Sequence, residues 1–366
     1  LNKRCIIFQI TQTKKSFPFG TAVASDEYLY GHQQYRDFLN KHFNWGTLEG
    51  ALKWPANENV RGHLTYDLPM KTIAELRKHG IKVRAHNIIW SVPTFIQNWV
   101  KALSGSALRQ AVSNRIHSVM NEVKGLVEHW DVNNENLHAQ WFQDRLHDGQ
   151  YNLEVFRLAH QTDPKVHLFL NEYDVVARGA YTQAYKNQAD HFKASNTGIY
   201  GIGVQGHFTD EMPPDPTLIK ARLDVLAQTG LPIWITELDV MAADENKRAQ
   251  FYETALRSLY GHPAVKGIVF WGFWSKRHWR GDKGAMVNAD FSVNAAGRKV
   301  IDLLENQWMT HETRSLSKSG DNYFTVHGFH GDYQVKVIYQ GHEIQDQRKS
   351  FTLGSSPYSI NVHVHK

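Results

Sequence analysis

Cysteine is nearly absent from this sequence, because Cys5 is the only one among 366 residues. A single cysteine excludes an intrachain disulfide and a cysteine-rich metal site. Long apolar runs are also lacking, and none approaches the roughly 20 residues that span a membrane. No cluster of lysine and arginine and no RNA-binding motif accompanies the net charge of +5, so we expect no nucleic-acid partner. We therefore predict no membrane association, no metal and no cofactor.

The pattern of apolar runs predicts an α/β fold. Hydrophobic residues make up 42% of the chain and charged residues 21%, which is ordinary for a globular protein with a large core. Runs with helical spacing alternate with eight strand-like runs, as in a (β/α)8 TIM barrel. A doubly wound sheet is the competing fold, but no glycine-rich phosphate turn follows the first strand. The predicted strands cover residues 17–23, 43–50, 81–90, 126–136, 166–173, 199–208, 231–240 and 266–273.

The pattern changes after Met309, where short alternating segments separated by turn residues predict a small antiparallel β module. Its predicted strands are 322–326, 333–339, 349–353 and 358–364. We thus predict three parts: a strand-containing extension at 1–16, the barrel at 17–312 and a β-sandwich-like module at 313–366. The extension could be an edge left from something upstream or a floor under the barrel. The module could bind polysaccharide, but its alternating aromatics suit a core at least as well.

The most informative stretch is the apolar run 231–240, which reads as a buried parallel strand. Glu237 and Asp239 stand near its end, and their spacing of two places them on one side of a strand. Each could simply begin a polar loop. A second strand-like stretch, 126–136, also ends in a carboxylate, Glu135, with Asn134 before it. Two carboxylates of this kind are what glycoside hydrolysis requires, one as proton donor and one as nucleophile or base.

The ends of the predicted strands share a chemistry. In a barrel these ends open on one face, so side chains far apart in sequence converge there. Carboxylates, amides and histidines can read sugar hydroxyls, and indole rings can cover the apolar faces of sugars. The side chains collected in this way are Glu49, Lys53, His86, Trp90, Asn134, Glu135, Asn171, Tyr173, Gln205, His207, Glu237, Asp239 and Trp271, with Trp279 in the last loop.

Eight motifs that carry these residues resemble glycoside hydrolase family 10, the endo-β-1,4-xylanases, and most closely its animal and plant branch. The resemblance covers roughly residues 17 to 310. The motifs are FPFGTA at 17–22, LKW at 52–54, VRAHNIIW at 83–90, WDVNNE at 130–135, NEY at 171–173, GVQGH at 203–207, ITELD at 235–239 and FWGFW at 270–274.

The resemblance implies a retaining mechanism. Glu135 would be the general acid/base, with a raised pKa, and Glu237 would be the nucleophile that forms a glycosyl-enzyme intermediate. Their carboxyl groups are expected to lie about 5 to 5.5 Å apart. His207 would hydrogen-bond the nucleophile, and Asp239 would hold that histidine from behind. Asn134 would contact the sugar 2-hydroxyl.

The resemblance also implies the sugar-binding residues. Glu49, Lys53, His86 and Gln205 would grip sugars on the non-reducing side or beside the cleavage point. Three tryptophans would line the −1 region, and Tyr173 would lie on the leaving-group side. These tryptophans are Trp90, Trp271 and Trp279.

Alternative interpretations exist for several of these residues. His86 could be a histidine of the core. His207 and Glu237 could bind zinc, but no third ligand stands at metal spacing nearby. The tryptophans could be core residues, and we favour this for Trp130 and Trp234, which lie on the other side of their strands. Trp279, in a polar loop, is better placed for stacking at the surface.

Four positions depart from the family pattern: Gly50, Ser91, Glu172 and Gly206. None removes a catalytic group. Gly50 and Ser91 replace larger polar residues on the glycone side, which leads to the hypothesis that the −2 subsite admits a sugar with a hydroxymethyl group. The enzyme could then cut β-1,4-glucan as well as xylan.

The leading interpretation is a xylanase with a polysaccharide substrate and added endoglucanase activity. The alternatives are a protein that is mainly a β-1,4-endoglucanase and a catalytically weak polysaccharide-binding protein. We expect a monomer. A secreted location is implied by the family and by the size of the substrate. The chain begins at Leu1 and shows no signal peptide, so an upstream segment could have been removed.

Overall fold

A computed structural model describes residues 6–316 and 322–362 of the chain. The chain divides into two compact units, Pro18–Lys299 and a second unit built from Leu1–Phe17 together with Val300–Lys366. None of the helices in the described residues combines the length and the hydrophobicity that crossing a membrane requires.

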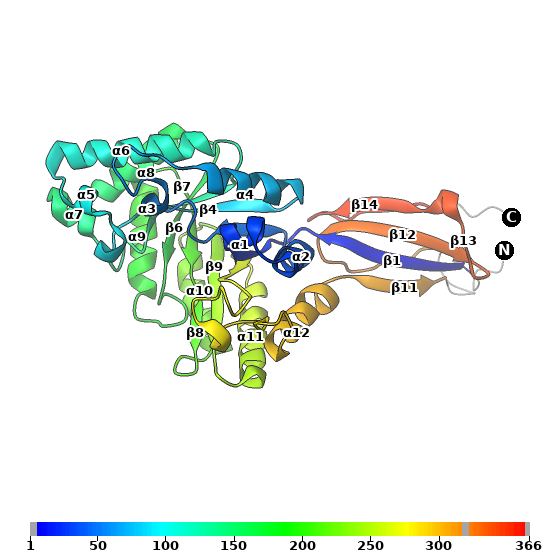
Figure 1. The fold of residues 1–366 in the computed structure, drawn as a ribbon. Coiled ribbons are helices and arrows are strands. Elements are labelled where there is room, and N and C mark those ends of the chain that lie inside the picture. Colours follow the sequence, from blue (N-terminus) through cyan, green and yellow to red (C-terminus); the bar gives the residue numbers. More distant parts are fainter. Residues whose placement is uncertain (1–5, 317–321, 363–366) are drawn as a thin grey trace. The chain divides into compact units, whose positions relative to one another are not determined.

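The first unit is a closed barrel of eight parallel strands (Figure 1). Each strand pairs in parallel with its neighbours, and β10 closes the ring by pairing with both β9 and β2. A short ninth strand, β8 (His207–Thr209), extends the sheet beside β9. The fold prediction is therefore confirmed. The barrel strands are β2 (Phe19–Val23), β3 (Trp45–Leu48), β4 (Lys82–Trp90), β5 (His129–Asn134), β6 (His167–Glu172), β7 (Ile199–Val204), β9 (Ile233–Met241) and β10 (Val265–Phe270).

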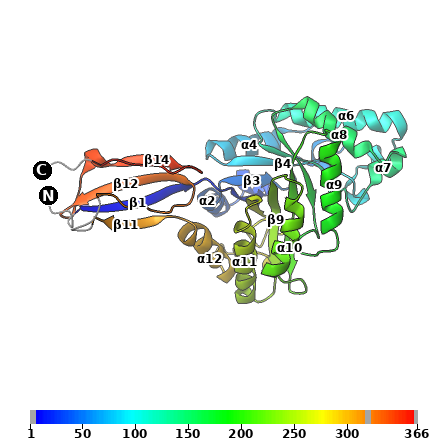
Figure 2. The same cartoon turned by 180° about the vertical axis from the view of Figure 1, so that it is seen from behind.

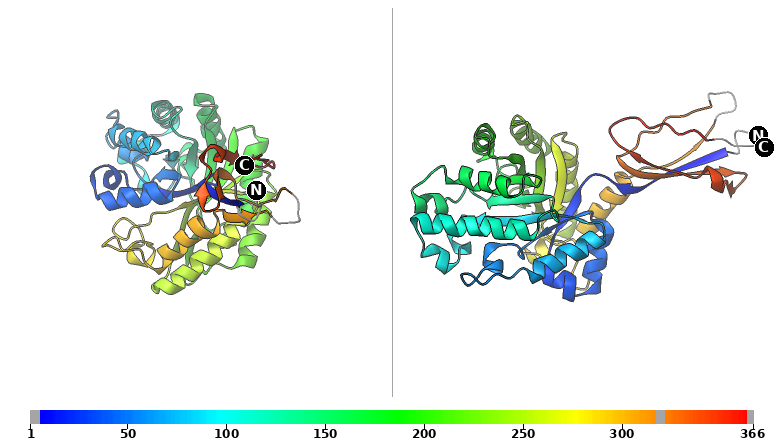
Figure 3. Two further views of the ribbon diagram at one scale, coloured as in Figure 1. Left: turned by 90° about the vertical axis from the view of Figure 1, so that its right-hand side faces the viewer. Right: turned by 90° about the horizontal axis from the view of Figure 1, so that it is seen from above.

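Helices cover the outside of these strands (Figures 2 and 3). Capping residues define some of their beginnings, since Asp215 accepts a hydrogen bond from the Leu218 N–H and Pro216 occupies the first turn of α10. Asp244 caps α11 in the same way. The α-helices are α1 (Ser25–Tyr30), α2 (Gln33–His42), α3 (Trp54–Asn57), α4 (Asp67–Lys78), α5 (Asn98–Lys101), α6 (Gly105–Glu122), α7 (Trp141–Leu146), α8 (Tyr151–Thr162), α9 (Thr182–Ala194), α10 (Pro216–Ala227), α11 (Glu245–Tyr260) and α12 (Ala295–Asp302). Short turns of other helix types are η2 (Pro93–Phe95), η3 (Gly281–Lys283), η4 (Leu303–Gln307) and η5 (Gln345–Gln347).

An aromatic cluster fills part of the barrel interior. Trp45, Phe169, Trp234 and Val269 come from four different strands and are all buried. The Arg84 guanidinium lies over the Phe169 ring and is itself neutralised by Asp131 on β5. Both tryptophans that we assigned to the core are buried, Trp234 within this cluster and Trp130 on β5. Packing of these side chains inside the barrel thus fixes the strands relative to one another.

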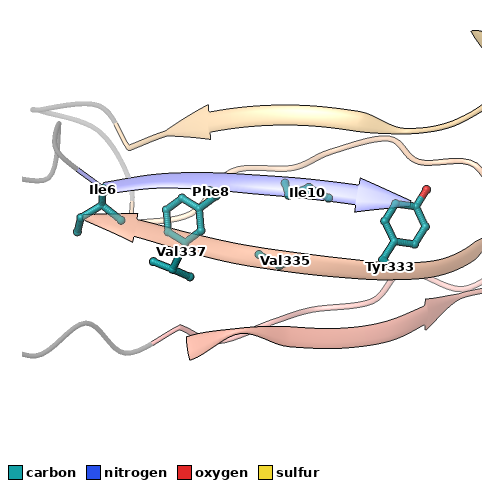
Figure 4. Packing of buried hydrophobic residues seen from close by; sticks show 6 residues of the cluster. All are labelled: Ile6, Phe8, Ile10, Tyr333, Val335 and Val337. Atoms are coloured by element: carbon teal, nitrogen blue, oxygen red, sulfur yellow. The ribbon is translucent and has the colours of Figure 1, made fainter. Parts of the chain in front are cut away.

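The second unit is an antiparallel sheet that joins the two ends of the described chain. Strand β1 (Ile6–Lys15) pairs with β11 (His311–Ser315) on one side and with β12 (Gly331–Tyr339) on the other. The short β13 (His342–Glu343) and β14 (Lys349–Leu353) also pair with β12. Figure 4 shows the core residues of this sheet, which alternate along β1 and β12. They are Ile6, Phe8, Ile10, Tyr333, Val335 and Val337.

This arrangement differs from the predicted division of the chain. The N-terminal strand is not a separate extension, since it pairs with β12 and its apolar face is buried by residues of that strand. Residues 300–312, which we had counted with the barrel, belong to the second unit. The described strands of this unit form one sheet, not a sandwich. Segments 322–326 and 358–362 are not strands, and residues 363–364 of the last predicted strand lie outside the described residues.

The aromatic residues of the second unit divide between core and surface. Tyr333 is buried, and Phe324, Tyr339 and Phe351 pack against its cluster. Tyr323 and Tyr358 are 73% and 57% exposed. Several of these aromatic residues therefore belong to the core, as the alternation suggested, while Tyr323 and Tyr358 are exposed to solvent.

Candidate active site

Glu135 follows directly after β5 in a left-handed backbone conformation, with φ of 57°. This conformation costs a residue other than glycine about 1 to 3 kcal/mol and needs support from its surroundings. The support comes from the Glu135 N–H, which donates to the Asn171 carbonyl, and from the Glu135 carbonyl, which accepts from the N–H groups of His138 and Ala139. The backbone thereby turns out of the strand and fixes the position of the carboxyl group.

The Glu135 carboxyl group accepts hydrogen bonds from two neutral donors. Gln205 Nε2 donates to Oε1, and Trp90 Nε1 donates to Oε2, each at 2.9 Å. Burial raises the pKa of Glu135, and the negative charge of Glu237 raises it further, whereas the Gln205 hydrogen bond opposes the shift. A carboxyl group with a raised pKa is suited to donate a proton near neutral pH.

Glu237 lies within β9 and is only 5% exposed. Its Oε1 accepts a hydrogen bond of 2.8 Å from Asn171 Nδ2 on β6, and its Oε2 lies 3.4 Å from His207 Nε2 on β8. The same Asn171 Nδ2 also donates to Asn134 Oδ1 at 2.9 Å. Asn171 therefore links the residue before Glu135 to Glu237, although its sequence position alone gave it no specific role.

A row of charged groups lies behind Glu237. His207 Nδ1 lies 2.9 Å from Asp239 Oδ1, and the other oxygen of Asp239 contacts Trp279 Nε1 at 2.5 Å and Arg280 Nε at 3.2 Å. Burial alone would lower the pKa of His207, but Asp239 and Glu237 together raise it to about 10. Burial would raise the pKa of Asp239, yet His207 and Arg280 hold it low. His207 is thus an imidazolium at neutral pH, with one N–H toward each carboxylate.

Two glycines shape this part of the barrel. A Cβ atom on Gly203 would lie 2.5 Å from Asn171 Oδ1, so only glycine leaves room for that amide. Gly206 has φ of +81° between Gln205 and His207, a conformation that glycine adopts without strain. These positions allow Gln205 to reach Glu135 and His207 to reach Glu237.

Three of the four predicted glycone-side residues, Glu49, Lys53 and His86, lie on or just after β3 and β4, whereas Gln205 follows β7. The Lys53 ammonium lies 4.9 Å from the centre of the Trp90 ring. Burial raises the pKa of Glu49, which Lys53 opposes, and burial lowers the pKa of Lys53, which Glu237 and Glu49 oppose. Lys53 is therefore within electrostatic range of both the nucleophile candidate and Glu49.

His86 and Trp271 are both buried, and their rings meet edge to face at 5.2 Å. His86 Nδ1 lies 2.8 Å from Asp131 Oδ2. Trp279 is 59% exposed and lies 5.2 Å from the His207 ring, edge to face. Its indole N–H is held by Asp239 while its ring remains open to solvent.

The sequence interpretation missed an anchor beside Tyr173. Tyr173 stacks on His138 with ring centroids 3.7 Å apart, and His138 Nδ1 lies 2.6 Å from Glu172 Oε1. The Leu137 N–H donates to the other oxygen of Glu172. Glu172 thus ties the segment after Glu135 to β6 and orients the Tyr173 ring. In the sequence it stood out only as a departure from the family pattern.

Ser91 does not lie where the glucan hypothesis placed it. It follows the end of β4 and is fully buried, and its hydroxyl donates to Asn133 Oδ1 at 3.1 Å. The interpretation of Ser91 as lost bulk in an open glycone subsite was therefore wrong, because its side chain is enclosed and already bonded. Gly50, in contrast, is exposed and has no atom within 4 Å of its missing Cβ. In residues 6–316 and 322–362 no group of three or more His, Cys, Asp or Glu could hold a metal ion.

Most of the chain is similar to known proteins of one family. The family model described as glycosyl hydrolase family 10 matches residues 9–302. The chain is 37% identical over 329 residues to anti-sigma-I factor RsgI6 of Acetivibrio thermocellus and 34% identical over 337 residues to endo-1,4-beta-xylanase 2 of Arabidopsis thaliana. Each alignment covers 90% of this chain but only 42% and 30% of the relative, so the chain spans less than half of either protein.

Solved structures show the same fold. Xylanase 10B from Thermotoga petrophila, solved in complex with xylobiose, superposes with a TM-score of 0.73 at 22% sequence identity. The superposition covers 80% of this chain and 94% of that one. Because the family model matches most of the chain and the barrel agrees with it, the chain belongs to glycosyl hydrolase family 10.

Proposed function

We propose that the chain is a retaining endo-β-1,4-xylanase that cleaves xylan by double displacement. The observation that carries the proposal is the contrast between the partly buried carboxyl group of Glu135 after β5 and the buried carboxyl group of Glu237 in β9. Glu135 has a raised pKa and neutral donors, whereas Glu237 lies beside the imidazolium of His207. The xylanase names of similar proteins support the choice of substrate.

In the first step, Glu135 gives its proton to the glycosidic oxygen while that oxygen leaves the anomeric carbon. A Glu237 oxygen attacks the same carbon from the opposite face, and a glycosyl ester forms. This geometry needs the two carboxyl groups about 5 to 5.5 Å apart, a separation that stays a prediction. The Trp90 and Gln205 hydrogen bonds stabilise Glu135 as the anion that remains after it has lost its proton.

In the second step, the Glu135 carboxylate takes a proton from a water molecule. The water oxygen attacks the anomeric carbon, the bond to Glu237 breaks, and both carboxyl groups return to their starting protonation. The sugar keeps its anomeric configuration because it has been inverted twice.

The surrounding residues position these groups. His207, held by Asp239, directs an N–H toward Glu237 and supplies a positive charge next to the leaving carboxylate of the second step. Asn134 accepts from Asn171 through Oδ1, which leaves its Nδ2 to donate to the sugar 2-hydroxyl. Glu49, Lys53, His86 and Gln205 bind sugars on the glycone side, with Trp90, Trp271 and Trp279 as ring surfaces. Tyr173 receives the leaving group.

A second activity, cleavage of β-1,4-glucan, is favoured by one observation. Gly50 leaves open space next to Glu49 and Lys53, so a glucosyl hydroxymethyl group meets no side chain there. The same observation supports the alternative that the enzyme is mainly an endoglucanase.

Reducing-sugar release from xylan and from carboxymethyl-cellulose, measured side by side, tests both proposals. We expect release from xylan, and we expect it to disappear in Glu237→Ala. Comparable release from cellulose would support the open glycone subsite. Release from neither polymer, with binding intact, would favour a polysaccharide-binding protein instead.

A further inference from the structure

A pocket of about 270 Å³ lies beside the proposed glycone subsite, within the barrel unit. Its walls are mainly aromatic or aliphatic, and five of the residues that line it have no role in the proposed hydrolysis. The pocket reaches the surface at Gly50 and at Phe95, which is 45% exposed. The five wall residues are Trp54, Pro55, Phe95, Ile96 and Phe142.

The pocket shares two side chains with the catalytic centre. Trp90 forms part of its wall, and the same indole donates to Glu135. Phe95 stacks on Trp90 with ring centroids 3.8 Å apart and planes within 9°. Lys53 is the cation of the pocket and lies over the Trp90 ring. A group attached to a sugar next to Trp90 and Lys53 can therefore enter this pocket.

One polar group of the lining has no partner. Asn87 is 1% exposed, and its Nδ2 finds no hydrogen-bond acceptor among the described residues. A buried amide donor without an acceptor is costly, so such groups usually bond to protein, water or ligand. The amide nitrogen of Gln97, the other amide of the lining, already donates to the Glu58 carbonyl. The pocket thus offers aromatic walls, one unused donor and one cation.

We propose that this pocket binds an aromatic acyl group that is ester-linked to the glycan as a branch. The aromatic ring packs between the walls, and the ester carbonyl accepts the hydrogen bond from Asn87 Nδ2. Lys53 contacts the oxygens near the mouth. This inference rests on the proposed function for the placement of the glycan, and the ester itself is bound and not cleaved.

The size of the pocket argues against a smaller occupant. A hydroxymethyl group has two non-hydrogen atoms and fills a space comparable to two water molecules, at roughly 30 Å³ each. The observed volume is several times larger and close to the lower end of small-molecule pockets, roughly 300 Å³. Mostly apolar walls also suit an aromatic ring better than a polar sugar branch.

Direct binding tests the pocket without any turnover. Ethyl ferulate, which carries the ring and the ester carbonyl, serves as the probe in saturation-transfer NMR with the full chain. Ala56→Trp on the exposed side of α3 fills the pocket, and Ala107→Trp on the exposed side of α6 is the matched control. We expect signal with the wild type and the control, and loss of signal in Ala56→Trp. Absence of signal in the wild type, or equal signal in Ala56→Trp, would overturn the proposal.

A second variant tests the unpaired amide. Asn87→Asp keeps the shape but replaces the donor with an acceptor, so we expect the dissociation constant of ethyl ferulate to rise about fivefold or more, as for loss of one hydrogen bond. An unchanged dissociation constant in a variant that melts like the wild type would remove Asn87 from the site.

The substrate experiment compares feruloylated arabinoxylan oligosaccharides with the same material after alkaline removal of the esters. We expect the wild type to favour the feruloylated form in kcat/KM by about fivefold, and Ala56→Trp to lower this ratio toward one while Ala107→Trp keeps it. A wild-type ratio of one or below contradicts the proposal. If neither material is cleaved, the proposed function fails, and the NMR experiment still decides whether the pocket binds the ester.

Discussion

Glu135 and Glu237 occupy comparable places on two barrel strands, yet their surroundings differ in kind. Glu135 has left the strand through a left-handed turn, and its carboxyl oxygens accept from an amide and an indole. Glu237 is still within β9, and one of its oxygens faces an imidazolium backed by Asp239 and Arg280.

The difference shows how one barrel rim can support two opposite protonation tasks. Neutral donors only partly offset the burial of Glu135, so its pKa remains raised and it can act as an acid. The positively charged His207 next to Glu237 stabilises the negative charge that a carboxylate carries as a nucleophile and as a leaving group. We propose that the donors around each carboxyl group, and not its place on the barrel, separate the two roles. Four predictions test this comparison, in order of decreasing expected effect.

The largest effect is expected when each glutamate is replaced by alanine and the variants are compared on a substrate whose leaving group needs no proton. Glu237→Ala removes the nucleophile, so kcat/KM should fall by about 10⁴-fold or more on every substrate. Glu135→Ala removes only proton donation and return, so dinitrophenyl xylobioside, whose leaving group needs no proton, should still show a burst of released phenol. Stopped-flow absorbance measures the burst. Equal loss of the burst in both variants would contradict the separate roles.

Removing the charge of Asp239 behind Glu237 should lower activity less than removing Glu237 itself. Asp239→Asn removes the charge that keeps His207 protonated, a buried charged hydrogen bond of about 2 to 3 kcal/mol, which corresponds to roughly 30- to 160-fold in kcat. Steady-state kinetics on xylan measures this loss. Asp290→Asn, at an exposed loop position, is the control and should keep full activity. Unchanged kcat in Asp239→Asn would argue against a role for the charges behind Glu237.

The His207 imidazolium should also appear in the pH dependence of stability. Its pKa is about 10 in the folded chain and about 6.5 when unfolded, so its stabilisation is complete below about 6.5 and is lost as the pH rises toward 10. We expect the wild-type Tm to fall by on the order of 5 °C across this range, and His207→Gln to show a flatter curve. Thermal melts followed by circular dichroism provide the measurement. Parallel curves for the two proteins would exclude His207 as the titrating group.

The smallest effect concerns a single donor to Glu135. The Trp90 indole N–H stabilises the carboxylate form, so Trp90→Phe should raise the pKa of Glu135 further. Glu135 then stays protonated to higher pH, and the alkaline limb of the kcat/KM profile should move upward by on the order of half a pH unit. The profile is measured on xylo-oligosaccharides. A shift to lower pH would show that the indole does not favour the carboxylate.

The barrel could be predicted from the sequence because its signals are local and repeated. Each parallel strand is a short apolar run, and a polar catalytic side chain at its end stands out against that run. The run 231–240 already contained Glu237 and Asp239. Strict alternation does not hold there, because the neighbours Thr236 and Glu237 both hydrogen-bond Asn171 and the pairing register shifts between Ile235 and Leu238. Trp130 and Trp234 are buried as predicted, with Trp234 inside the barrel cluster.

Contacts between distant residues could not be predicted in this way. Ser91 was placed by its departure from the family pattern, whereas its side chain is buried and bonds Asn133. The pair of His138 and Glu172 bridges 34 residues, and no spacing in the sequence marks it. For β1 a signal did exist, because its apolar residues alternate as in an antiparallel strand, and alternation of the same kind recurs in β12.

The place of β1 in its sheet has a consequence for how the protein is made. Its partners β11 and β12 begin at His311 and Gly331, so the ribosome completes β1 about half a minute before it has synthesised either of them, at a few to twenty residues per second. During that time the barrel sequence emerges and can fold, while Ile6, Phe8 and Ile10 have no sheet to cover them. The exposed strand is then a target for chaperones and for pairing with another nascent chain. This sheet therefore forms only after β11 and β12, which follow the whole barrel sequence, have been synthesised.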